Sequence, residues 1–404
     1  MKSFKDTLKE DKNTHMEHLE DEIINNGVKG ANTAVLFLKS LKDLLAGGKS
    51  KTNITVKWDG APAIFAGTDP SDGKFFVAKK GIFNKNPQIY KTAADCDEFL
   101  SGDLAVKMKD ALKYLPELGI QGVIQGDFLF GAGDVKTKTI EGTKYTTFHP
   151  NTIVYAIPFE QSKLVRDAKI GIVWHTTYKG KDFENMSASY GVDVSKLKQS
   201  KNVWSQDAML RSVDATMTQK ETEQVNDYLS KIGKLFNQIA GSTLRVLESN
   251  PTLAGTIETY GNTLVRQGTY IQDPKAHTRS LIAYIQGKYQ KEIDKRKTEK
   301  GKSVQVAKLE EVMKFFSPQN RASLEKMFEM QKLIVLAKLK LINKLNSLKK
   351  IDTFVRTRQG YKVTGEEGYV AIDKLGGDAV KLVDRMEFSY NNFSPDILKG
   401  WEKS

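Results

Sequence analysis

The stretch that decides the fold class is Ile54-Thr55-Val56-Lys57-Trp58-Asp59-Gly60. Its β-branched start is typical of a strand, and Asp-Gly between two apolar runs favours a hairpin turn. Similar short runs, separated by Gly, Asp and Pro, lie at 63–66, 75–78, 123–130, 152–157 and 170–174. Runs of this length with turn residues between them predict antiparallel sheets.

Helical periodicity dominates two other parts of the chain. Residues 1–50 have an amphipathic pattern that ends at Gly47-Gly48, and residues from about 203 to 350 are helical in pattern almost throughout. Strand-like alternation returns at 351–390. Three helix starts carry cap signals: Thr218 with Glu221, Asp273 with Pro274, and Ser317 with Pro318.

These patterns predict an α+β fold in which an antiparallel-sheet core is split by an all-helical insertion. We expect an N-terminal helical segment at 1–50 and the first part of the core at 51–185. The helical insertion then spans 186–350, with 181–202 as a polar connection, and the second part of the core spans 351–404.

The composition of the 404 residues points to a soluble protein with a polyanionic partner. Lys and Arg number 62 against 49 Asp and Glu, a net charge of +13. The most apolar run, 333–342, contains Lys338 and Lys340, so no membrane span is predicted. The charged N-terminus lacks a signal-peptide centre, and the single cysteine, Cys96, excludes an internal disulfide. We therefore expect a cytoplasmic protein.

The Lys-x-Asp-Gly sequence at Lys57 has two interpretations. It is a common hairpin turn beside an ordinary lysine, or it holds the nucleophile of a covalent nucleotidyltransferase. In the second case a neutral amine attacks a nucleotide α-phosphate, although a free lysine has a pKa of about 10.4. The site would then need further cations, carboxylates and a metal.

Suitable residues do follow in order along the chain. Lys80 lies at a glycine turn, Asp127 stands in an apolar strand beside an aromatic residue, and Tyr155 lies in mid-strand. Far downstream are Glu367, in Glu-Gly-Tyr-Val, and Lys381, in an apolar-flanked run.

This ordered set resembles the motifs of the ATP-dependent RNA/DNA ligase and mRNA-capping superfamily. That superfamily has an ATP-grasp-like nucleotidyltransferase core. The set is most similar to phage-type RNA ligases, which suggests a phage origin. The resemblance covers 54–160 and 364–390, about a third of the chain.

The resemblance implies a role for each matching residue. Lys57 would carry AMP, with the Val56 backbone, Asp59 and Gly60 shaping its pocket. Lys80 would contact sugar and phosphate, and Tyr155 would stack on the purine. Glu367 and Asp127 would organise Mg²⁺, and Lys381 would hold the α-phosphate.

Two positions depart from the family pattern. Asp127 replaces the usual glutamate, and Val383 stands where a second lysine is usual. We expect Arg385 to substitute for that lysine, since residues 381, 383 and 385 share one face of a strand.

The expected function is therefore ATP-dependent ligation of polynucleotide ends, with RNA as the expected acceptor, through a lysyl-AMP intermediate with Mg²⁺. The alternatives are a related enzyme with another acceptor or GTP as donor, such as a DNA ligase or capping-like enzyme, and a non-catalytic basic nucleic-acid-binding protein with a degenerate pocket. The helical insertion would bind RNA or a protein partner. Its basic run at 295–302, near Tyr284 and Tyr289, is either a nucleic-acid contact or a solvated loop.

Overall fold

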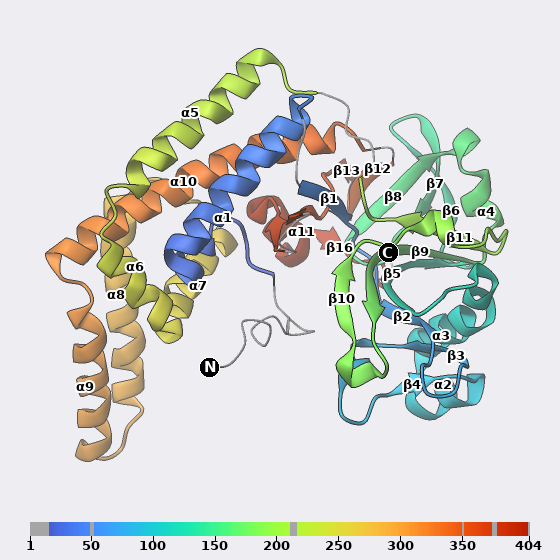
Figure 1. Cartoon of the computed structure of the whole chain (residues 1–404), viewed down its shortest axis with the longest axis horizontal. Helices are drawn as coiled ribbons and strands as arrows, with labels where there is room; N and C mark the ends of the chain where they lie inside the picture. Colours follow the sequence, from blue (N-terminus) through green and yellow to red (C-terminus); the bar gives the residue numbers. More distant parts are fainter. Residues whose placement is uncertain (1–15, 49–51, 211–215, 350, 374–377, 403–404) are drawn as a thin grey trace.

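The computed structural model describes residues 16–48, 52–210, 216–349, 351–373 and 378–402. These residues form a helix-rich half and a strand-rich half, on opposite sides of Figure 1. The predicted mixture of helices and largely antiparallel sheets is confirmed. The predicted limits at residues 50 and 350 fall outside the described residues.

A three-stranded sheet joins parts of the chain that are far apart in sequence. Its strand order is β1-β14-β15, with all pairs antiparallel. The strands are β1 (Thr52–Lys57), β14 (Gly368–Asp373) and β15 (Ala379–Leu382). Residues 17–19 run along the free edge of β15, where the Lys381 N–H donates to the Glu17 carbonyl at 3.0 Å.

A seven-stranded sheet has the order β10-β9-β5-β2-β3-β4, and β11 also pairs with β9. Helix α3 (Gly102–Tyr114) covers one face, where Met108 and Ala111 pack in one apolar cluster with Ile64 and Ile124. The strands are β2 (Ala63–Thr68), β3 (Phe75–Ala78), β4 (Ile89–Tyr90), β5 (Val123–Gly131), β9 (Ile170–Lys179), β10 (Ser187–Tyr190) and β11 (Val203–Asp207).

The prediction that 186–350 is all helical is wrong at its beginning. Strands β10 and β11 both pair with β9, β11 in parallel orientation. The long strand β9 offers one edge to both of them, so residues up to 207 belong to the sheet. Long-range pairing of this kind leaves little local pattern in a short polar segment.

A six-stranded sheet completes the strand-rich half, with the order β13-β12-β8-β7-β6 and β16 beside β12. Its strands come from parts of the chain that precede and that follow the helical region in sequence. The strands are β6 (Lys136–Ile140), β7 (Thr143–Phe148), β8 (Ile153–Pro158), β12 (Asp352–Thr357), β13 (Gly360–Val363) and β16 (Ile397–Leu398).

The capping signals at Thr218, Asp273 and Ser317 are confirmed, because each side chain accepts a backbone N–H in the first turn of its helix. The helices of the helix-rich half are α1 (Glu22–Leu45), α5 (Gln219–Phe236), α6 (Gly241–Ser249), α7 (Pro251–Arg266), α8 (Pro274–Asp294), α9 (Glu299–Lys314) and α10 (Pro318–Asn346). The other α-helices are α2 (Ala93–Phe99), α3 (Gly102–Tyr114), α4 (Lys163–Asp167) and α11 (Arg385–Phe393).

The N-terminal helix is part of the helix-rich half. Leu38 and Leu41 of α1 share one apolar cluster with Leu247 of α6 and Leu341 of α10, and Figure 1 shows α1 lying along α10. Within the described residues, no helix has the length and apolar character needed to cross a membrane.

Candidate functional site

Antiparallel pairing of β1 with β14 brings Lys57 to Glu367. Lys57, the last residue of β1, lies opposite Gly368, the first residue of β14. Glu367 immediately precedes that partner, and its Oε2 forms an ion pair with the Lys57 Nζ. Residues 310 positions apart in sequence thus meet at the end of one sheet.

The third strand adds Lys381 to this pair. Lys381 lies opposite Val370 in the pairing of β14 with β15. Burial lowers the pKa of Lys381, and the positive charge of Lys57 lowers it further. The two ammonium groups therefore share one electrostatic environment.

Asp127, on β5 of the seven-stranded sheet, lies near the charged groups of Lys57 and Glu367. A Cβ atom on Gly60 would lie 2.5 Å from the Asp127 Cβ and 3.0 Å from the Phe128 carbonyl oxygen. Only glycine allows the turn after β1 to lie this close to β5. Lys57, Glu367 and Asp59 all influence the pKa of Asp127.

Asp59 fixes that turn to the rest of the fold. Its carboxylate accepts hydrogen bonds from the backbone N–H groups of Thr152 at 2.6 Å and Ile153 at 2.7 Å. It also accepts one from Asn151 Nδ2 at 2.7 Å. The Val56 N–H donates to the Ala208 carbonyl at 2.8 Å. Asp59 and Val56 thus hold the backbone around Lys57.

The carboxyl groups near Lys57 titrate close to neutrality. Burial raises the pKa of Glu367 to about 7 and that of Asp127 to about 7, although the charge of Lys57 opposes both shifts. Near pH 7 these groups exchange protons readily, which suits general acid–base chemistry.

His175 is a member of this group that sequence analysis missed. Its Nε2 lies 3.8 Å from the Asp127 Oδ2. Gln125 and Gly126 of β5 pair with Thr176 and Trp174 of β9, so His175 is the extra residue of a β-bulge. Burial, and then the charge of Lys57, lower its pKa to about 4, so the imidazole is neutral near pH 7. A long-range bulge leaves no signal in the local sequence. We call Lys57, Asp127, His175, Glu367 and Lys381 the Lys57 cluster.

Tyr155 does not lie where a base could stack on it. Its ring is fully buried in the strand-rich half, with Trp58 at 4.8 Å and Phe148 at 5.4 Å between ring centroids. Its hydroxyl accepts the Asp59 N–H at 2.7 Å. The prediction that Tyr155 is a stacking surface disagrees with this placement, because β8 lies in the middle of its sheet and is buried over most of its length.

Lys80 lies on none of the strands that carry the Lys57 cluster. It begins a 3-10 turn at Lys80–Phe83 and is exposed. Among the described residues, no ion pair or side-chain hydrogen bond joins it to the cluster.

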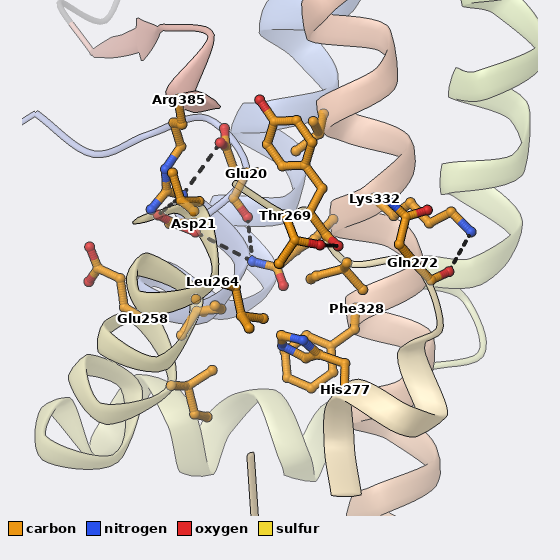
Figure 2. Close-up of a pocket in the computed structure, with 18 of the residues that line it drawn as sticks. Glu20, Asp21, Glu258, Leu264, Thr269, Gln272, His277, Phe328, Lys332 and Arg385 are labelled. Atoms are coloured by element: carbon orange, nitrogen blue, oxygen red, sulfur yellow. Dashed lines mark hydrogen bonds and ion pairs between the residues drawn. The ribbon is translucent and has the colours of Figure 1, made fainter. Parts of the chain in front are cut away.

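The prediction that Arg385 shares a strand face with Lys381 is wrong. Strand β15 ends at Leu382, and Arg385 is the first residue of α11, which Asp384 caps. Its guanidinium points into the helix-rich half, where it pairs with Asp21 at 2.9 Å (Figure 2). The helix cap turns the chain away from the sheet before residue 385.

Arg385 belongs to a buried ion network that joins α10, the start of α11 and the residues just before α1. Lys338 of α10 is fully buried and pairs with Glu20 at 2.8 Å, and Arg385 also lies 3.5 Å from Glu20. Gln331 Nε2 donates to the Glu20 carbonyl at 2.9 Å. We call Glu20, Asp21, Lys338 and Arg385 the buried network. The buried network anchors residues 17–19 against β15. Because the Lys381 N–H donates to the Glu17 carbonyl, the network also holds the backbone of Lys381.

Within the described part of the chain, no group of three or more His, Cys, Asp and Glu side chains is arranged to hold a metal ion. The model of a family of unknown function, DUF6267, matches residues 13–396. The chain belongs to the DUF6267 family. The match spans both halves, so the helix-rich region is part of what defines the DUF6267 chain. Neither the curated proteins nor the solved structures gave a match.

Proposed function

We propose that this DUF6267 chain is a covalent nucleotidyltransferase that carries AMP on Lys57 and joins RNA ends. The observation that carries the proposal is the meeting of Lys57, Asp127, Glu367 and Lys381, which are spread over 325 positions of the sequence. Each motif alone is common. Transfer of AMP to a lysine requires these side chains to lie close together.

In the first step the Lys57 Nζ attacks the α-phosphorus of ATP. The nitrogen–phosphorus bond forms as the bond to the bridging oxygen breaks, and pyrophosphate leaves with the electron pair. Glu367 is ion-paired with Lys57 and has a pKa of about 7, so it can accept the proton that the amine loses. Lys381 offers positive charge to the phosphate beside it.

Two carboxylates near Lys57 suit Mg²⁺, which commonly binds one or two protein carboxylates together with substrate phosphates. Asp127, and Glu367 while it is ionised, would provide this donor set. When bound, Mg²⁺ would supply charge neutralisation for the triphosphate.

The later steps transfer AMP and seal the ends. A 5′-phosphate oxygen of the polynucleotide attacks the AMP phosphorus, and Lys57 leaves as the free amine. A 3′-hydroxyl then attacks the activated 5′-phosphate and releases AMP. The choice of RNA over DNA rests on the resemblance to phage-type RNA ligases.

The test is the intact mass of the purified full chain after incubation with Mg²⁺ and either ATP or GTP. We expect an adduct of one AMP in the wild type, its loss in Lys57→Met, and its reversal by added pyrophosphate. The exposed-site variant Lys179→Gln should form the adduct normally. If folded wild-type protein forms no adduct with either nucleotide, the proposal is wrong.

A GTP-specific adduct would instead assign a GTP-dependent enzyme of the same kind. Once an adduct is found, joining assays decide the acceptor. Strands with 5′-phosphate and 3′-hydroxyl ends, made of RNA or of DNA, should be compared under the same conditions. Joining of DNA alone would contradict the RNA assignment.

A further inference from the structure

The outer parts of α8 and α9 project from the helix-rich half as a two-helix arm (Figure 1). We define the arm as residues 288–308. All residues of α9 are exposed or half-exposed, and by length this helix extends for about 24 Å. An element of this kind is held by few apolar contacts, so its surface is available to a partner.

The arm concentrates positive charge. Its 21 residues contain eight Lys or Arg and three Asp or Glu, so they hold +5 of the total charge of +13. The ion pairs within the arm involve Lys295, Arg296 and Lys302, so five lysines have no ion pair within the described parts of the chain: Lys288, Lys291, Lys297, Lys300 and Lys308. The remaining basic residues pair with Glu292 or Glu299, three or four positions earlier in the chain, and such exposed pairs are weak.

Three cations form a row at the end of α8. Lys288, Lys291 and the C-cap residue Lys295 follow each other at spacings of three and four residues, so they lie on one face over about 10 Å. Glu292, the partner of Lys295, is the acidic residue on this face. A row of this length matches a chain of phosphates better than a single anion. Neighbouring like charges also repel each other, and a bound polyanion would relieve that repulsion.

The aromatic residues near the arm are used for packing. Tyr284 lies against Tyr260, with ring centroids 5.2 Å apart, and both Tyr284 and Tyr289 are half-buried against the helical core. The expectation that these rings stack on bases therefore receives no support from their placement. The arm offers charge without base stacking.

Among polyanions, the composition of the arm favours nucleic acid over a membrane surface. A membrane-bound helix needs large apolar anchors such as Trp, Phe or Leu along one face. The arm has no Trp or Phe in its sequence, and its exposed apolar residues include Val304 and Val306.

We propose that the arm binds the sugar–phosphate backbone of nucleic acid through charge alone, without base readout. The identification of that strand as RNA rests on the proposed function. The arm would hold the substrate strand in the helix-rich half while the Lys57 cluster acts on its end.

The test is binding of the full chain, without ATP, to fluorescent single-stranded poly(A) and poly(U) over a range of salt concentrations. The arm variant carries Lys288→Gln, Lys291→Gln, Lys297→Gln and Lys300→Gln. The matched control loses the same charge through Lys181→Gln, Lys201→Gln, Lys220→Gln and Lys234→Gln, all at exposed positions.

For the arm variant we expect affinity to fall by about 100-fold at physiological salt, and the slope against log salt to decrease by about 3. The control should change the affinity by less than about threefold, because its lysines lie outside the contact. Wild-type affinities for poly(A) and poly(U) should be similar.

Equal losses in both variants would overturn the proposal, since only net charge would then matter. So would unchanged binding by the arm variant, or binding of an acidic peptide in place of RNA. If no adduct forms on Lys57 but the arm variant loses RNA binding, the proposed function fails and the arm inference stands.

Discussion

The Lys57 cluster and the buried network contain the same residue types but differ in how far these residues are exposed. Each pairs a lysine with a glutamate. The Lys57 side chain is 34% exposed and that of Glu367 is 11% exposed, whereas the values for Lys338 and Glu20 are 0% and 4%. The first pair is open to a ligand, and the second is closed.

The pKa values of the two glutamates, Glu367 and Glu20, are shifted in opposite directions. Burial raises the pKa of Glu367 to about 7. Burial would also raise the pKa of Glu20, but the charges of Lys338 and Arg385 together hold it below its usual range. A second cation and good geometry keep Glu20 ionised, while Glu367 remains able to exchange a proton. The two pairs thus differ in exposure and in the number of partners, as the reactive role proposed for Lys57 and Glu367 requires.

The largest expected effect comes from the same substitution at the two lysines. Lys338→Met leaves Glu20 charged and short of a partner inside the protein, so we expect a loss of about 4 kcal/mol in the free energy of unfolding. Lys57→Met should cost less than about 1 kcal/mol because its ion pair is partly solvated. Urea denaturation of both variants measures the difference.

The double variant Glu20→Gln/Lys338→Met serves as the control, since it removes the unpaired charge and should recover much of the loss. If Lys57→Met proves as destabilising as Lys338→Met, the Lys57–Glu367 pair is not the weaker, partly solvated ion pair that its exposure indicates.

The next effect concerns the second cation of the Lys57 cluster. Lys381→Gln removes positive charge beside Lys57, and we expect adduct formation to slow by about 100-fold with little change in stability. Single-turnover mass spectrometry after mixing with ATP measures the rate. Lys179→Gln, at an exposed position of β9, is the matched control and should react at the wild-type rate. An unchanged rate in Lys381→Gln would remove Lys381 from the proposed reaction.

The smallest effect tests a buried group without an opposite charge. His277 lies near the buried network in the same pocket (Figure 2), and burial lowers its pKa from 6.5 to about 4. The folded state then binds fewer protons than the unfolded state between these pH values. Its contribution to stability is therefore present above about pH 6.5 and is lost as the pH falls toward 4.

His277→Leu should lack this pH dependence. The difference in unfolding free energy between wild type and variant should change by about 2 kcal/mol between about pH 7 and about pH 4.5. Contributions from His18, His149 and His175 are common to both proteins and cancel. Urea denaturation at the two pH values provides the measurement, and a constant difference would show that the pKa of His277 is the same in the folded and the unfolded state.

Local sequence predicted much of the strand-rich half. The runs at 63–66, 75–78 and 123–130 all lie within observed strands, because β-branched and aromatic residues between turn signals favour strands wherever they occur. Helix starts at Thr218, Asp273 and Ser317 were equally clear, since a cap bonds within its own first turn.

The errors arose where distant parts of the chain decide the structure. The strand at Val203–Asp207 depends on an available edge of β9, and His175 faces Asp127 because of a bulge between two distant strands. Arg385 was misplaced because a strand alternation was extended beyond Leu382, where the Asp384 cap begins a helix.

The sequence by itself determined the mixed α+β class, the helix starts after Thr218, Asp273 and Ser317, and the order of Lys57, Asp127, Glu367 and Lys381, because propensity, caps and motif order are local properties. Only the tertiary structure decided which charges meet. Strand pairing brought Lys57 to Glu367 and left their ion pair partly open. Helix packing enclosed Lys338 with Glu20. Exposure and partner number are set by contacts between residues hundreds of positions apart, and these quantities separate a candidate nucleophile from a structural lysine.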